Sequence, residues 1–247
     1  MTKLFPILLL AISLQSCSGF TYKERTNEQS SDTPLSYTLE KTVLNDTSRY
    51  YTVSIEYPLA KTTSAGGNQA FVDAFNQSMK TMIDSLTLQY RGEQLDSLKK
   101  LINETRTSGK FETYVKYKTF LVSDHYLGLK LEIYEYTLGA HGFTSQRCLN
   151  FSVPDGKLLK LTDVLDLDGG KLSTLNSLLV QCFENPDSCF DGKPEISENY
   201  PRFSLDDEEL VFTFEAYELG PYACGEASIP VPYSLLRKSN LLKVNLP

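Results

Sequence analysis

The sequence predicts an α+β fold in which antiparallel β-sheets carry two to three helices packed on one face. Long runs rich in β-branched and aromatic residues are interrupted by segments whose apolar residues recur every three or four positions. These segments do not follow the regular strand–helix–strand order of a parallel α/β fold, which favours α+β. The chain has 247 residues, enough for one large domain or two small ones.

The N-terminal segment MTKLFPILLLAISLQSC is typical of a bacterial lipoprotein signal. Lys3 precedes an apolar run that is too short to span a bilayer of about 30 Å as a helix. The ending Leu-Gln-Ser-Cys17 resembles a lipobox, in which the cysteine becomes the lipidated first residue, with palmitate among its acyl chains. An ordinary secretory signal that ends near a cysteine is the alternative. We expect residues 1–16 to be the signal peptide of an extracytoplasmic, membrane-anchored lipoprotein, with the outer membrane favoured.

The segment 17–36 is polar and rich in serine and threonine, as expected of a flexible tether. Folded structure should begin near Tyr37, with an N-terminal α+β part over 37–136 and a C-terminal part over 137–247. The net charge of −7 argues against a nucleic-acid partner, which requires a basic surface, and suits a basic protein.

The first elements follow from two periodicities. Strands are expected over 37–44 and 49–58, because Tyr51, Val53 and Ile55 alternate with polar residues as one buried face requires. A glycine pair then ends the strand pattern. Apolar residues recur at helical spacing after it, with Asn68 as the expected N-cap. A second, weaker helical pattern covers 93–104.

Long strand patterns dominate the middle of the chain, over 110–123, 125–138 and 141–153. Because short turns join them, sequential strands should pair antiparallel. A helix is expected over 169–185. The chain then returns to strands at 201–205, 210–219 and 227–232, and ends with a short helix or turn at 233–237.

The cysteines indicate disulfides. Removing the signal and setting Cys17 aside leaves Cys148, Cys182, Cys189 and Cys224, and an even number outside the cytoplasm permits three connectivities. We favour Cys182–Cys189 and Cys148–Cys224. A zinc site is the alternative, but no Cys-x-x-Cys or His-x-x-x-His spacing supports it, so no metal or other cofactor is expected.

Searches for catalytic motifs fail. There is no Gly-x-Ser-x-Gly and no glycine-rich phosphate loop. An EF-hand reading of 163–170 fails because Val164 and Leu175 stand where acids are needed, so Asp168 is expected near a helix N-terminus instead. The four acids at 206–209 suit a solvated hairpin tip better than a glycosidase pair. We expect a protein without enzymatic activity.

The stretch YELGPYACGEASIPVPYSLL at 217–236 is the strongest candidate for a binding surface. Its prolines interrupt sheet pairing and stiffen the chain, and its tyrosines add amphipathic contact area. A preordered loop loses less entropy when it binds. The alternative is that these rings only pack the end of a sheet, and that His141 only packs over its turn. We predict ligand contacts from Tyr217, Pro221, Tyr222, Tyr233 and His141.

The same stretch resembles the terminal signature of domain-of-unknown-function family 3298 (DUF3298), as found in the ectodomains of RsiV-type anti-sigma factors. Upstream, YEYTLGAHGFTSQRCLNFSVPDGKLLKLTDVL at 134–165 resembles the same family, and 50–136 is similar to a companion domain that also precedes the catalytic domain of a peptidoglycan deacetylase. The resemblance implies an α+β ectodomain that binds lysozyme. We expect neither sigma-factor release nor deacetylation, because the corresponding segments are missing from the sequence.

Taken together, these features predict a lipid-anchored envelope protein that binds a protein or glycan ligand. Lysozyme is the leading candidate, since it is strongly basic and the chain is acidic. Two alternatives stay open at this point. One is a peptidoglycan-processing enzyme that uses His141 and nearby acids, and the other is a structural envelope lipoprotein without a ligand.

Overall fold

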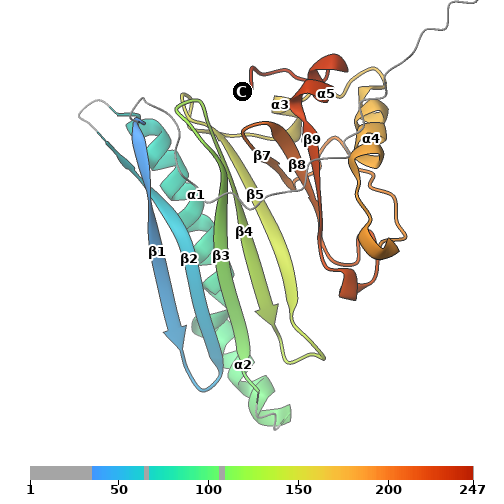
Figure 1. The fold of residues 1–247 in the computed structure, drawn as a ribbon. Coiled ribbons are helices and arrows are strands. Elements are labelled where there is room, and N and C mark those ends of the chain that lie inside the picture. The colour runs from blue at the N-terminus through green and yellow to red at the C-terminus, as the bar shows by residue number, and fades with distance from the viewer. Residues whose placement is uncertain (1–34, 64–66, 106–108, 247) are drawn as a thin grey trace, which may run out of the picture.

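The computed structural model describes residues 35–63, 67–105 and 109–246. A six-stranded sheet carries two helices on one face, and a three-stranded sheet with its own helices lies beside the last long strands (Figure 1). The predicted signal peptide, Cys17 and most of the tether lie outside the described residues. Within the described ranges, no helix is both long enough and apolar enough to cross a membrane.

The larger sheet is built from the first two thirds of the described chain. Its strands occur in sequence order from edge to edge, and its helices fall between the second and third strands. The elements are β1 (Tyr37–Thr47), β2 (Tyr51–Thr62), α1 (Gln69–Thr87), the 3-10 turn η1 (Leu88–Tyr90), α2 (Gly92–Thr105), β3 (Phe111–Val122), β4 (Tyr126–Tyr136), β5 (Phe143–Ser152) and β6 (Lys157–Leu158).

The smaller sheet has the order β7-β8-β9 and is antiparallel throughout. Helix α4 lies on its outer side (Figure 1). The elements are α3 (Leu161–Val164), α4 (Lys171–Cys182), η2 (Pro186–Ser188), β7 (Phe203–Leu205), β8 (Glu209–Phe214), η3 (Tyr222–Cys224), β9 (Ala227–Pro232) and α5 (Tyr233–Lys238).

All neighbouring strands of the larger sheet pair antiparallel except β2 and β3, which pair parallel. The exception arises because α1 and α2 carry the chain from one end of the sheet back to the other, as a parallel connection requires. The predicted antiparallel pairing of the three long strands β3, β4 and β5 is confirmed. The parallel pair was not predicted.

Helix α1 is held on the sheet by its cap and by an aromatic core. The Asn68 side chain accepts a hydrogen bond from the Phe71 amide at 3.0 Å, which confirms the predicted N-cap. Phe71, Phe75 and Phe151 then pack together with ring centroids 5.3–6.2 Å apart. These rings are fully buried and fix α1 across the strands.

The two sheets are joined by a buried polar contact. The Asn150 amide on β5 donates to the Phe203 carbonyl at 2.7 Å and accepts from the Leu205 amide at 2.8 Å, so it acts as a strand neighbour for β7. A Cβ at Gly128 would lie 2.4 Å from the Leu205 carbonyl oxygen. Glycine is therefore needed where β7 crosses the larger sheet.

The predicted α+β class is confirmed, and so are the positions of its main strands and helices. The short helix α3 was not predicted, because four residues carry no readable helical period. The division proposed between 136 and 137 stays a prediction. The larger sheet runs across that point, because β5 pairs with β4 from Tyr126–Ser152 to Glu135–Phe143.

Candidate functional site

The connection between β8 and β9 forms a loop that is tied to the rest of the molecule at several points. A disulfide joins Cys224 to Cys189, whose Cα atoms are 5.8 Å apart. The amides of Asp191 and Gly192 both donate to the Leu219 carbonyl, at 3.1 and 2.8 Å. The loop is therefore ordered before any ligand arrives. The expected interruption of sheet pairing by proline holds for Pro221, which lies in the loop, but is wrong for Pro230 and Pro232, which pair with Val211 and Glu209 as part of β9.

Three rings form a stack on this loop and on the neighbouring turn between β4 and β5. The His141 and Tyr222 rings lie 4.3 Å apart between centroids and 28° from parallel. Tyr217 continues the stack, with its ring 5.5 Å from that of Tyr222. We call these three residues the aromatic ladder. The three residues, each predicted as a ligand contact, therefore lie side by side, and the contact itself stays a prediction.

The ladder is anchored by one backbone carbonyl. The Tyr222 hydroxyl donates to the Gly142 carbonyl oxygen at 3.0 Å, and His141 Nδ1 lies 2.8 Å from the same oxygen. Because a carbonyl only accepts, this arrangement requires the proton on Nδ1.

The ladder is also accessible. Tyr217 is 59% exposed and Tyr222 is 36% exposed, while Pro221 and His141 are both exposed. Tyr217 lies in the turn that follows β8 and has a positive φ of 75°. Rings that are both stacked and solvent-exposed offer contact area at a low entropy cost.

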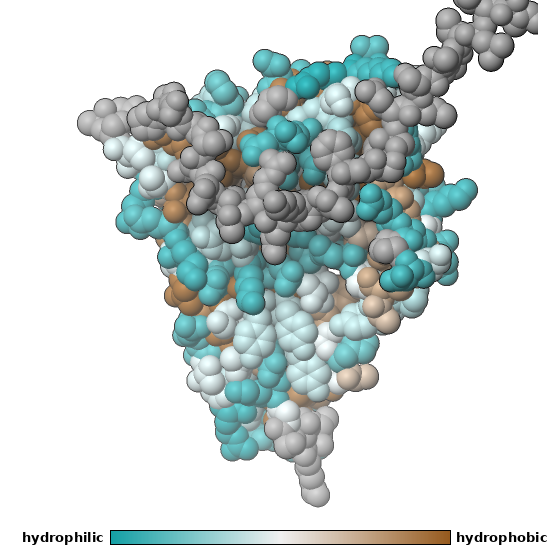
Figure 2. All heavy atoms as spheres, in the orientation of Figure 1, coloured by the Kyte–Doolittle hydropathy of each residue, from teal (hydrophilic) through white to brown (hydrophobic). Residues whose placement is uncertain are grey.

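Two further tyrosines extend this surface along the larger sheet. Tyr114 on β3 and Tyr134 on β4 lie on the face opposite the helices, with ring centroids 6.0 Å apart. The Tyr134 ring lies directly against Gly142, where a Cβ would come within 2.3 Å of it. Pale side chains gather over the lower half of this sheet on the face seen in Figure 2, and Tyr114 is 37% exposed.

The charged residues near the ladder are largely paired. Arg202 forms ion pairs with Glu218 and, at 3.8 Å, with Glu215, and the Glu215 carboxylate accepts from the Gln146 amide at 2.6 Å. Lys130 pairs with Glu226 at 2.8 Å. The ladder is therefore framed by ion pairs in which the acids outnumber the bases by one, and its own rings supply the apolar contact area.

One predicted contact residue is wrong. Tyr233 is only 1% exposed, and its hydroxyl donates to the Asp206 carbonyl at 2.9 Å. Burial raises the pKa of this phenol above its usual value. The strand register explains the difference, because β9 pairs Pro232 with Glu209 and so brings Tyr233 over the core.

Both predicted disulfides are wrong. Cys189 pairs with Cys224 instead of Cys182, and Cys148 carries a free thiol on β5 between the two sheets. Burial raises the pKa of that thiol. Cys182 lies on the buried face of α4, and the segment after the helix carries Cys189 away from it toward the loop between β8 and β9.

The other acidic residues singled out from the sequence add no catalytic or metal-binding group to the site. Asp168 lies near the N-terminus of α4, as predicted, and its backbone carbonyl accepts from the Lys171 amide at 3.1 Å, but the N-cap is Gly170 and no side chain caps the helix. Lys171 pairs with Asp166 instead, and this lowers the pKa of Asp166. Asp207 and Glu208 are exposed at the predicted hairpin tip. Among the described residues, no group of three or more His, Cys, Asp or Glu side chains could hold a metal ion.

The fold and the ladder define an α+β protein with an exposed aromatic surface on a disulfide-bridged loop. Residues 44–144 match the family model described as deacetylase PdaC, and 179–234 match the protein of unknown function family DUF3298. The chain therefore carries a PdaC-like region ahead of a DUF3298 region.

Similar proteins agree with this assignment. The chain is 22% identical over 95% of its length to the peptidoglycan-N-acetylmuramic acid deacetylase PdaC of Bacillus subtilis, and it spans 50% of that relative. A DUF3298 family structure from Bacteroides fragilis matches with a TM-score of 0.62 and 20% identity, over 85% of this chain and 94% of the other. One from Pseudomonas aeruginosa matches with a TM-score of 0.56 and 17% identity, over 86% and 96%. The two structures show the shared fold.

Proposed function

We propose that this chain is a lipid-anchored envelope protein that binds a protein or glycan ligand without catalysis, with lysozyme as the leading candidate. The name of the B. subtilis relative refers to peptidoglycan, which supports a role at the cell wall. The chain covers only half of that relative, so the relative's deacetylase activity is not carried over.

The aromatic ladder is the observation that carries this proposal. His141, Tyr222 and Tyr217 are stacked and exposed, and the disulfide and the Gly142 carbonyl hold them in place. Exposed tyrosines of this kind are typical of the anchors at binding interfaces. The net charge of −7 adds attraction toward a basic protein such as lysozyme, mainly through faster association.

Binding of immobilised lysozyme at physiological salt tests the proposal. We expect the folded domain to be retained, and Tyr222→Ala and Tyr217→Ala each to weaken binding by about tenfold or more, as hot-spot residues do. Val180→Ala is the matched control, because Val180 is an exposed apolar residue on α4, away from the ladder. Lack of retention, together with no inhibition of wall lysis, would remove lysozyme as the ligand.

A parallel assay with soluble peptidoglycan fragments separates a glycan ligand from a protein ligand. If the fragments are retained, lysozyme is not, and Tyr222→Ala abolishes the retention, the ligand of the ladder is a glycan. Turnover of the fragments that vanishes in His141→Ala would instead favour a peptidoglycan-processing enzyme.

The lipid anchor is tested separately in cells. We expect labelled palmitate to be incorporated into the wild-type protein and not into Cys17→Ala, which should also leave the membrane fraction. Equal labelling of the two proteins would contradict the proposed anchor, and it would leave the binding proposal intact.

A further inference from the structure

A cavity of about 280 Å³ opens at the end of the larger sheet, where β1 passes the connection between α1 and α2. Helix α1 ends at Thr87, and one 3-10 turn leads to Gly92, whose φ of +54° redirects the chain into α2. The cavity lies where this turn faces the end of β1. It is lined by Leu44, Asn45, Asp46, Val53, Thr87, Tyr90 and Arg91.

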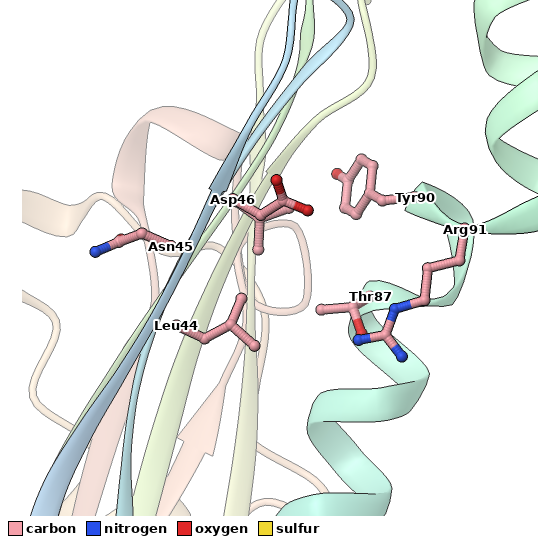
Figure 3. A pocket seen from close by; sticks show the side chains of 7 residues that line it. Leu44, Asn45, Asp46, Thr87, Tyr90 and Arg91 are labelled. Carbon is pink, nitrogen blue, oxygen red and sulfur yellow. The ribbon is translucent and has the colours of Figure 1, made fainter.

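The side chains of β1 face the helical turn across this space. Figure 3 shows Leu44 and Asp46 pointing from the strand toward Thr87 and Tyr90, while Asn45 points to the other side. Leu44, Val53 and the Tyr90 ring supply apolar wall, and Asp46 and Arg91 supply opposite charges. The cavity therefore combines an apolar surface with one anionic and one cationic group.

The walls are held in place before any ligand binds. The Tyr90 hydroxyl and Thr113 Oγ1 are hydrogen-bonded at 2.6 Å, and the Tyr90 ring packs on Tyr51 with centroids 4.7 Å apart. Tyr51 in turn donates its hydroxyl to Asp46 Oδ2 at 2.9 Å. A pocket whose polar groups are already oriented loses little entropy when a ligand enters.

Both charged groups keep hydrogen-bonding capacity. Tyr51 uses one oxygen of Asp46, and the other oxygen has no hydrogen-bond partner among the residues that the structure describes. The Arg91 guanidinium lies 3.7 Å from Asp84, which is beyond hydrogen-bond length, and Asp84 also pairs with Lys80. Arg91 can therefore still offer the two parallel donors that bind a carboxylate.

We infer that this cavity binds a free zwitterionic amino acid with an aliphatic side chain. Its ammonium group binds Asp46, its carboxylate binds Arg91, and its side chain covers Leu44, Val53 and the Tyr90 ring. The volume is near the lower end of small-molecule sites, at about 300 Å³, and suits one amino acid better than a sugar chain. This site shares no residue with the aromatic ladder and does not depend on the proposed function.

Titration of the isotope-labelled domain with leucine, followed by NMR, tests this inference. We expect shifts of the Leu44, Thr87 and Tyr90 resonances at millimolar leucine. Leucinamide lacks the carboxylate and 4-methylpentanoate lacks the ammonium group, so each should bind about ten- to hundredfold more weakly, as the loss of one charged hydrogen-bonded contact predicts.

Two variants assign each charge to its residue. Arg91→Gln should bind leucine no better than leucinamide, and Asp46→Asn should bind leucine no better than 4-methylpentanoate. Lys41→Gln is the control, because it removes a charge from the same strand outside the cavity. Absence of shifts with leucine in the folded wild-type protein would overturn the inference, and so would equal binding of leucine and leucinamide by it.

Discussion

The His141 ring lies 4.3 Å from the Tyr222 ring, and this stack joins two parts of the chain that match different families. His141 falls within the region that matches the PdaC model, which ends at residue 144. Tyr222 falls within the DUF3298 region, which begins at residue 179. The exposed aromatic surface is therefore completed only when the two regions fold against each other.

Tyr222→Phe should distinguish the contribution of the ring stack with His141 from that of the hydrogen bond made by the Tyr222 hydroxyl. The phenylalanine ring keeps the stack with His141 but loses the hydrogen bond to the Gly142 carbonyl, which is 3.0 Å long. We expect the free energy of unfolding to fall by about 1 kcal/mol, as measured by urea denaturation. Ligand binding should persist in Tyr222→Phe and be lost in Tyr222→Ala. Equal loss in both variants would show that the hydroxyl itself binds the ligand.

Gly142→Ala should disturb the ladder, because the Gly142 carbonyl holds both Tyr222 and His141. The new Cβ would lie 2.3 Å from the Tyr134 ring, so that ring or the turn must move. We expect a loss of about 1–3 kcal/mol in unfolding free energy, as overpacking produces. Adding Tyr134→Ala to Gly142→Ala should restore part of the lost unfolding free energy, because the double variant has no ring at this position. Gly139→Ala is the control, because its Cβ would meet only the His141 carbonyl oxygen, at 3.8 Å.

Removal of the Cys189–Cys224 bond should loosen the loop between β8 and β9. The bond closes a segment with a sequence separation of 35, so the double variant Cys189→Ala, Cys224→Ala should lose about 2–4 kcal/mol in unfolding free energy. Mass spectrometry of a non-reduced digest should find these two cysteines linked. A digest that links Cys148 to Cys224 would contradict the structure.

Asn150→Ala should weaken the joint between the sheets. It leaves the Phe203 carbonyl and the Leu205 amide without their buried side-chain partner. We expect a loss of about 2–4 kcal/mol in unfolding free energy, because each unsatisfied buried group costs about 1–3 kcal/mol. Asn45→Ala, on the exposed part of β1, should change stability by no more than about 0.5 kcal/mol. Similar losses in the two variants would contradict the proposed joint.

The stability of the start of β1 should depend on pH through Asp124. Hydrogen bonds from the side chain and backbone of Ser36 lower the pKa of this carboxyl below its ordinary value. A group whose pKa is lowered by folding stabilises the fold above its unfolded pKa of about 3.9, and this stability is lost as the pH falls through the folded value. The protection factors of the β1 amides, which correct for the pH dependence of intrinsic exchange, should therefore fall below about pH 4. Asp124→Ala should lack that step, and an unchanged step would assign it to another carboxyl.

Local sequence signals predicted most of the elements correctly. Asn68 caps α1 as expected, because capping depends on residues three positions apart. The alternation of Val53 and Ile55 with polar residues also predicted the strand β2 correctly, since both side chains face the core. The parallel pairing of β2 with β3 was missed, because it depends on how α1 and α2 pack.

The candidate site was predicted only in part. His141, Tyr217, Pro221 and Tyr222 were expected at an exposed surface and lie there, yet Tyr233 from the same stretch is buried. Sequence could not distinguish these tyrosines, because strand register decides which rings face water. Tyr114 and Tyr134 were missed, since they read as ordinary strand residues until the turn at Gly142 comes to lie against them.

The sequence by itself determined the α+β class, the order of strands and helices, and a stiff tyrosine-rich loop, because short-range periodicity and turn chemistry encode these features. Tertiary structure alone decided which cysteines pair, which tyrosines reach water, and that an acidic and a basic residue face each other across the cavity beside β1. The physical reason is that such contacts join residues far apart in the chain, so their distances are set by packing and not by spacing.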